Sequence, residues 1–133
     1  MAKDPFFEYL KQVPMFADLS PQELRAVGSV TTGINLPAGR TVLTEGAHAN
    51  EMVIVVNGVL DVLRNGEIIA EIGPGGFAGE MALLTHGHRN ATVVARTDVH
   101  VLHIDGRSFT SLLEQVPQIA VKMLPIVAAR AAA

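Results

Sequence analysis

The sequence predicts one mainly β domain, a β jelly-roll barrel with helices at both ends. Between residues 31 and 104 the chain consists of short β-branched runs separated by turn signals, and outside that region apolar residues recur at helical spacing. The 133 residues are 49% hydrophobic and 17% charged, which suits a single buried core. We therefore expect one domain over 1–133, with helices over about 5–30, the barrel over about 31–104 and two helices over about 105–133.

Two short helices are expected before the β region. In the stretch 5–13, a proline suited to a first turn precedes apolar residues at helical spacing, namely Phe6, Tyr9, Leu10 and Val13. Further on, Ser20 and Glu23 have the spacing of a capping box, and Pro21 occupies the first helical position. This pattern predicts a second helix over about 21–28.

The β region is divided by turns of recognisable chemistry. Its runs read TTGINL, TVLTEG, EMVIVV, VLDVLR, EIIAEIG, ATVVAR and VHVLHI. Asn57-Gly58 and Asn65-Gly66 are dipeptides that type I′ hairpins favour, because both central residues need positive φ. Longer turns are expected at 37–39 and 73–76. Short strands at this spacing are typical of a sandwich, jelly roll or barrel.

The chain returns to helical spacing after Asp105, which suits an N-cap. The first helix there carries its apolar residues at Phe109, Leu112, Leu113 and Val116. Pro117 ends that helix, and a last helix follows with Ile119, Met123 and Val127 on one face. Pro125 lies inside this last helix and is expected to kink or break it.

Bulk properties exclude several classes of function. The net charge of −3 does not suit direct nucleic-acid binding, and the absence of cysteine excludes disulfides, thiolate zinc sites and a cysteine nucleophile. No G-x-S-x-G elbow is present, so nucleophilic catalysis has no support. No apolar run suits a signal peptide or a membrane span. We expect a soluble, cytoplasmic, non-enzymatic domain with no membrane partner.

Residues 73–93, GPGGFAGEMALLTHGHRNATV, interrupt the strand pattern. The glycines at 75, 76 and 79 permit unusual backbone geometry and a close approach by a ligand. The five residues from Glu80 can form one helical turn, whose first N–H groups make an anion site beside the glycines. Arg89 can fold back over the same point.

These residue types indicate a particular ligand chemistry. The guanidinium of Arg89 matches the oxygens of a phosphate, whereas the carboxylate of Glu80 accepts hydrogen bonds and so suits a hydroxyl. A ribose that carries a cyclic phosphate offers both groups. A nucleoside triphosphate would call for a P-loop lysine and a magnesium ligand, which this stretch lacks.

The same stretch resembles the phosphate-binding cassette of cyclic nucleotide-binding domains, here over residues 75–93. The matching residues are FAGEMALL at 77–84, then THGH, then Arg89 and Asn90 before ATV. VPMFADLSPQEL is similar to the entry helix of that family, and LPAGRTVLTEGAHANEMVIVVNGVLDV to its first strands. The resemblance covers nearly the whole chain and implies a jelly roll flanked by helices.

The resemblance also implies the roles of single residues. Glu80 binds the ribose 2′-hydroxyl with help from the Gly79 backbone, Arg89 pairs with the cyclic phosphate, and the backbone N–H groups of Ala82 and Asn90 complete the phosphate cradle. Met81 and Ala91 complete the set of ligand-binding residues.

Two positions depart from the family pattern. His88 replaces the usual proline, and Asn90 stands where relatives often carry Ala, Ser or Thr, so it leaves the choice between adenine and guanine open. We expect cAMP as the family default, with cGMP remaining open, and neither a cofactor nor a metal. In this family the last helix closes over the base, which makes Arg130 a candidate lid residue.

Three alternatives stay open. Glu80 and Arg89 can form a structural salt bridge, and Arg130 can simply be solvated. The His86-Gly-His88 triplet has the spacing of a cupin metal site, but no acidic residue follows before Asp98, which favours an exposed loop. The chain can also be a degenerate domain that binds an unidentified protein effector without a ligand. It is expected to be a monomer or weak dimer.

Overall fold

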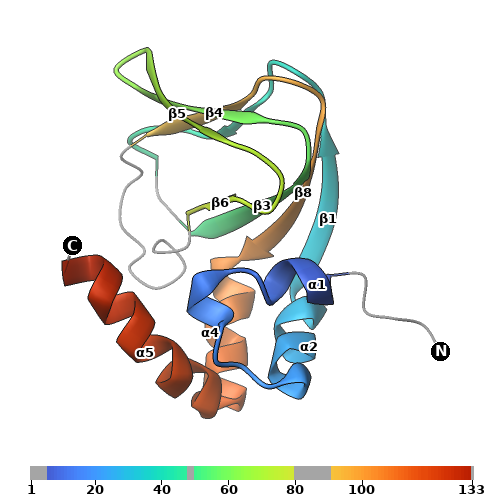
Figure 1. The fold of residues 1–133 in the computed structure, drawn as a ribbon, viewed down its shortest axis with the longest axis vertical. Coiled ribbons are helices and arrows are strands. Elements are labelled where there is room, and N and C mark those ends of the chain that lie inside the picture. Colours follow the sequence, from blue (N-terminus) through green and yellow to red (C-terminus); the bar gives the residue numbers. More distant parts are fainter. Residues whose placement is uncertain (1–5, 48–49, 80–90, 133) are drawn as a thin grey trace.

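The computed structural model describes residues 6–47, 50–79 and 91–132, with the backbone alone for residues 130–132 (Figure 1). Its helices are α1 (Phe7–Leu10), the 3₁₀ helix η1 (Pro14–Phe16), α2 (Pro21–Ser29), α4 (Gly106–Gln115) and α5 (Pro117–Ala132). Its strands are β1 (Thr31–Leu36), β2 (Thr41–Leu43), β3 (Glu51–Asn57), β4 (Leu60–Arg64), β5 (Glu67–Ile72), β6 (Phe77–Ala78), β7 (Thr92–Ala95) and β8 (Val99–Asp105).

The described strands form two four-stranded antiparallel sheets. The first sheet has the order β1-β8-β3-β6, and the second sheet has the order β2-β7-β4-β5. Apolar residues from both sheets pack together between them, among them Leu43, Val53, Val55, Leu60, Val93, Ala95, Val99 and Val101. Two facing antiparallel sheets are the architecture of a jelly roll, so the predicted fold class is confirmed.

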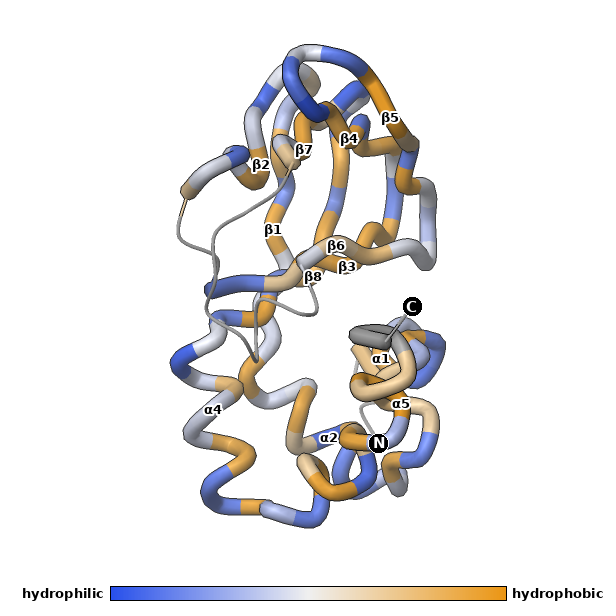
Figure 2. Tube along the Cα trace, turned by 90° about the vertical axis from the view of Figure 1, so that its left-hand side faces the viewer, coloured by the Kyte–Doolittle hydropathy of each residue, from blue (hydrophilic) through white to orange (hydrophobic). Residues whose placement is uncertain are grey.

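The first sheet is covered on both faces. Alternate residues of β3 point to opposite sides: Val53 and Val55 face the second sheet, while Met52 and Ile54 pack in a cluster with the helices. Figure 2 shows this sheet lying between the helices and the second sheet. We call this second group of apolar side chains the helical cluster. Its buried members also include Leu10, Phe16, Val27, Leu102, Ile104, Phe109, Ile119 and Met123.

The capping box predicted at α2 is confirmed in full. Glu23 N donates to Ser20 Oγ at 3.2 Å, and Ser20 N donates to Glu23 Oε1 at 2.8 Å. The helix predicted over 5–13 is shorter than expected. It ends at Leu10, and Val13 cannot be part of it, because Val13 precedes Pro14 and adopts an extended conformation with ψ of 122°.

Only one of the two predicted type I′ hairpins is present. Asn65 and Gly66 have φ of 53° and 82° and join β4 to its partner β5. The hairpin predicted at Asn57-Gly58 is wrong, because β3 belongs to the first sheet and β4 to the second. Gly58, with φ of 92°, carries the chain from one sheet to the other.

The two C-terminal helices are confirmed, and so is Asp105 as N-cap, since its side chain accepts from Ser108 N at 3.1 Å. The chain bends by 116° between α4 and α5, which begins at Pro117. The break expected at Pro125 does not occur, because α5 continues through it to Ala132. In the described part of the chain no single helix is long and apolar enough to cross a membrane; only the bent pair meets that test together.

Candidate functional site

The glycine-rich turn at the start of the predicted cassette is attached to the first sheet. Gly75 N donates to Val55 O at 2.8 Å, and Val55 N donates to Gly76 O at 2.8 Å. Gly75 has φ of 86°, as expected for a turn that needs glycine. A Cβ atom at Gly76 would lie 2.6 Å from the Ile72 side chain. The turn thus holds the start of the cassette at a fixed place on β3.

Two short strand pairings lie on either side of the central part of the predicted cassette. Ala78 pairs with Val53 on the first sheet, and Gly79 follows with φ of 86°. On the other side, half-buried Ala91 precedes Thr92, which pairs with Leu63 on the second sheet. The predicted cassette therefore connects the two sheets.

Most of the predicted ligand-binding residues lie outside the described residues. These are Glu80, Met81, Ala82, Arg89 and Asn90, together with the loop histidines His86 and His88. Of the predicted set the structure describes Gly79 and Ala91, which stand on either side of residues 80–90. Arg130, the candidate lid residue, lies in the last turns of α5, and its side chain is not described.

An ion pair joins β3 to its neighbour β8 in the first sheet. His103 Nε2 bonds to Glu51 Oε2, and both side chains are partly exposed, at 26% and 35%. The Glu51 carboxylate raises the pKa of His103, while partial burial opposes that shift. His103 pairs with Val53, which in turn pairs with Ala78, so this histidine lies two strands from the start of the cassette.

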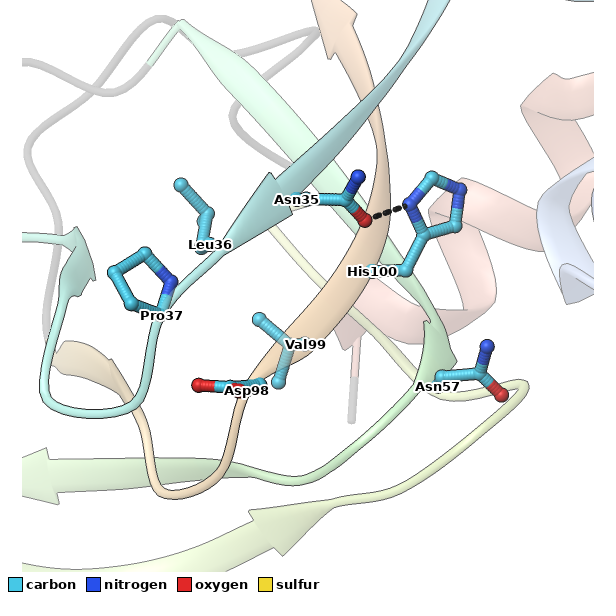
Figure 3. Close-up of a pocket in the computed structure, with 7 residues that line it drawn as sticks. All are labelled: Asn35, Leu36, Pro37, Asn57, Asp98, Val99 and His100. Atoms are coloured by element: carbon cyan, nitrogen blue, oxygen red, sulfur yellow. Dashed lines mark hydrogen bonds between the residues drawn. The ribbon is translucent and has the colours of Figure 1, made fainter.

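A separate hollow lies at the opposite end of the first sheet (Figure 3). Its volume is about 510 Å³, and it is lined by Asn35, Leu36, Pro37, Asn57, Asp98, Val99 and His100. A hydrogen bond of 2.7 Å joins His100 Nδ1 to Asn35 Oδ1. His100 is three residues from His103, or roughly 10 Å along β8. The lining carries a carboxylate and no lysine or arginine, so this hollow is poorly suited to a phosphate.

His100 and His103 cannot share one ion, because three residues on a strand place them on opposite faces. Their different partners, Asn35 and Glu51, agree with that separation. Within the residues that the structure describes, no three His, Cys, Asp or Glu side chains come together as a metal site. Sequence reasoning missed both pairs, because each partner comes from another strand and is found only once the strand register is known.

Comparison with known proteins identifies the same family that the sequence of the cassette resembles. A family model described as the cyclic nucleotide-binding domain matches residues 34–116. The chain is 32% identical over 113 residues to a cAMP-dependent protein kinase regulatory subunit of Aspergillus niger, covering 84% of this chain and 28% of that protein. It is 33% identical over 114 residues to a cyclic nucleotide-gated potassium channel of Mesorhizobium japonicum, covering 86% and 32%. The chain thus spans about a third or less of these relatives.

A solved structure extends the match to the whole fold. The N-terminal domain of a transcriptional regulator from Streptomyces coelicolor A3(2) superimposes with a TM-score of 0.85 at 27% identity. That alignment covers 92% of this chain and 91% of the other. The kinase subunit, the channel and the regulator are different proteins that share this one domain. The chain therefore belongs to the cyclic nucleotide-binding domain family.

Proposed function

We propose that this domain binds a cyclic nucleotide, with cAMP as the first candidate, and acts as a non-enzymatic regulatory sensor. The observation that carries the proposal is the position of the cassette. Gly79 leaves β6 with positive φ on the first sheet, and the chain re-enters the second sheet after Ala91. Between these two points stand a carboxylate and a guanidinium at the family spacing.

The division of roles follows from the chemistry of the residues. Arg89 offers a planar fork of N–H donors to the cyclic phosphate, and the backbone N–H groups of Ala82 and Asn90 add donors. Glu80 accepts from the ribose 2′-hydroxyl beside the Gly79 backbone. Met81 and Ala91 line the same site. Because Glu80 and Arg89 engage different parts of one ligand, loss of either weakens binding without changing the fold.

The preference for adenine or guanine depends on residues other than Glu80 and Arg89. The amide side chain of Asn90 both donates and accepts hydrogen bonds, so it is compatible with adenine and with guanine. Arg130, at the end of α5, is the proposed contact over the base. Ligand binding would then favour one arrangement of the C-terminal helix, through which the domain signals to a protein effector.

Calorimetry with matched arginine variants tests the proposal. In Arg89→Ala a buried phosphate would lose its partner, and the affinity for cAMP should fall by ~2–5 kcal/mol. Arg40→Ala, at an exposed arginine outside the cassette, should bind as the unchanged protein does. Glu80→Gln should lower the affinity for cAMP more than the affinity for 2′-deoxy-cAMP, which lacks the hydroxyl. Equal affinity of Arg89→Ala and Arg40→Ala would refute the role of Arg89. No binding of cAMP or cGMP by the unchanged protein would instead favour a degenerate domain that works through protein contacts.

A further inference from the structure

His103 and Glu51 lie on the face of the first sheet that is turned towards the second sheet. On β3, Val53 follows Glu51 by two residues and packs between the two sheets. On β8, Val101 precedes His103 by two residues and packs in the same place, whereas Leu102, between them, packs in the helical cluster. Side chains two residues apart on a strand point to the same face. His103 and Glu51 therefore border the space between the sheets.

The same two side chains lie at an edge of that space, close to the start of the predicted cassette. Val53 is 1% exposed, whereas the side chains of His103 and Glu51 are 26% and 35% exposed. His103 pairs with Val53, and Val53 pairs with Ala78, so one row of residues crosses β8, β3 and β6, which Figure 1 shows in the first sheet. Adjacent strands are about 4.8 Å apart, so His103 lies roughly 10 Å from Ala78. Gly79, whose backbone borders the ribose in the proposed function, is the next residue of the chain.

The charge at this edge depends on pH. The hydrogen bond to Glu51 raises the pKa of His103 above its ordinary value of about 6.5, the charges of Glu51 and Asp105 act in the same direction, and partial burial opposes them. The neighbour of His103 on β1 is the uncharged Thr32, and Arg107, in the first turn of α4, is exposed. Protonated His103 therefore balances the Glu51 carboxylate, and loss of that proton leaves the carboxylate unbalanced.

From this placement we propose that His103 links nucleotide binding to proton binding. Protonated His103 offsets Glu51 and favours the anionic cyclic phosphate, whereas neutral His103 leaves a negative charge that weakens binding. The proposal rests on the proposed function for the identity of the ligand. It adds a residue from β8 that sets the affinity through its charge, at a distance, in an interior where charges interact more strongly than in water.

The direction of the linkage follows from the charges. The bound phosphate stabilises the protonated form of His103, so binding raises the pKa of His103 further and takes up protons from solution. The affinity should therefore be highest at acid pH and should fall as the pH rises through the pKa values of the free and bound states. The phosphodiester of cAMP keeps its single negative charge throughout this range, so the change comes from the protein.

Calorimetry at several pH values tests the proposal with two matched histidine variants. Between about pH 6 and pH 8.5, the Kd of the unchanged protein for cAMP should rise about three- to tenfold more than that of His103→Gln, as expected for one charge at roughly 10 Å. His100→Gln, on the opposite face of the same strand, should follow the unchanged protein. His86 and His88 are present in all three proteins, so their titration cancels in the comparison.

Two further readouts separate a charge effect from a loss of stability. His103→Lys keeps a positive charge and should bind cAMP at pH 8.5 as tightly as at pH 6, whereas a variant that only loosens the fold would bind less tightly at every pH. In NMR titrations, the imidazole resonances of His103, identified by their loss in His103→Gln, should report a higher pKa with saturating cAMP than without it. An unchanged His103 pKa on binding would overturn the proposal.

The two proposals fail in different ways. If neither cAMP nor cGMP gives heat at any pH, the proposed function fails and the linkage fails with it. If cAMP binds and its Kd depends on pH equally in the unchanged protein and in His103→Gln, the proposed function stands and the role of His103 is wrong. A Kd that falls as the pH rises in the unchanged protein but not in His103→Gln would contradict the direction of the linkage.

Discussion

Gly58 passes so close to the backbone carbonyl of Asp98 that no side chain fits between them. A Cβ atom at this position would overlap that oxygen and would lie 2.8 Å from Thr97 Oγ1. Val59 N donates to the same Thr97 Oγ1 at 3.1 Å, and Arg96 N donates to Val59 O at 2.9 Å. The connection between the two sheets is therefore built against the turn that precedes β8.

Substitution of Gly58 should show that this close approach matters more than the backbone angle alone. Gly58 and Gly66 both have positive φ, at 92° and 82°, but a Cβ atom at Gly66 meets nothing within 4 Å. Gly66→Ala should cost about 1 kcal/mol of unfolding free energy from the angle. Gly58→Ala should cost about 3 kcal/mol, because backbone must also move. Urea unfolding measures both, and equal losses would contradict the crowding at Gly58.

The pair formed by His103 and Glu51 should make stability depend on pH. Pairing raises the pKa of His103 in the folded chain above its ordinary value of about 6.5, and Asp105 on the same strand acts in the same direction. The contribution is fully present below about pH 6.5 and is lost as the pH rises through the folded-state pKa.

The measurement is the difference in unfolding free energy between the unchanged protein and His103→Gln, from pH 5.5 to 8.5. Taking the difference cancels the contributions of the other titrating groups to the unfolding free energy, because both proteins share those groups. The difference should be largest at the acid end and should shrink as the pH rises. A difference that grows with pH, or that stays constant, would contradict the shift.

Phe109 should be among the largest single contributors to the helical cluster. Its side chain is 0% exposed, and its ring centroid lies 6.1 Å from that of Phe16. Phe109→Ala should therefore lower the unfolding free energy by about 3–5 kcal/mol. Val121→Ala, at a residue 64% exposed, should stay within about 0.5 kcal/mol of the unchanged protein. Losses of similar size in the two variants would refute this description of the core.

Local signals in the sequence predicted the features that depend on neighbouring residues. The capping box at Ser20 and Glu23 and the turn at Asn65-Gly66 each involve residues at most three apart, and both are confirmed. The dipeptide Asn57-Gly58 has the same turn chemistry but a different structure. Whether two strands pair depends on the rest of the sheet, and here β3 pairs with β6 and β8 instead of β4.

For the candidate site, too, the sequence predicted some features and not others. The residue types and spacing around Gly79 predicted the family, which the family match confirms. The roles of Glu80 and Arg89 remain predictions. The contact between Lys122 and Glu23 joins residues 99 positions apart, and periodicity alone shows only that both belong to helices. Such long-range contacts require the packing of the helices to be known.

Titration of the nucleotide-free chain with cAMP, followed by cGMP, tests the central claim most directly. Calorimetry should give binding with a Kd in the micromolar range or tighter for at least one of the two, at one site per chain, and the ratio of the two affinities would measure the preference associated with Asn90. Absence of heat with both nucleotides, together with an unchanged thermal unfolding temperature, would contradict the account.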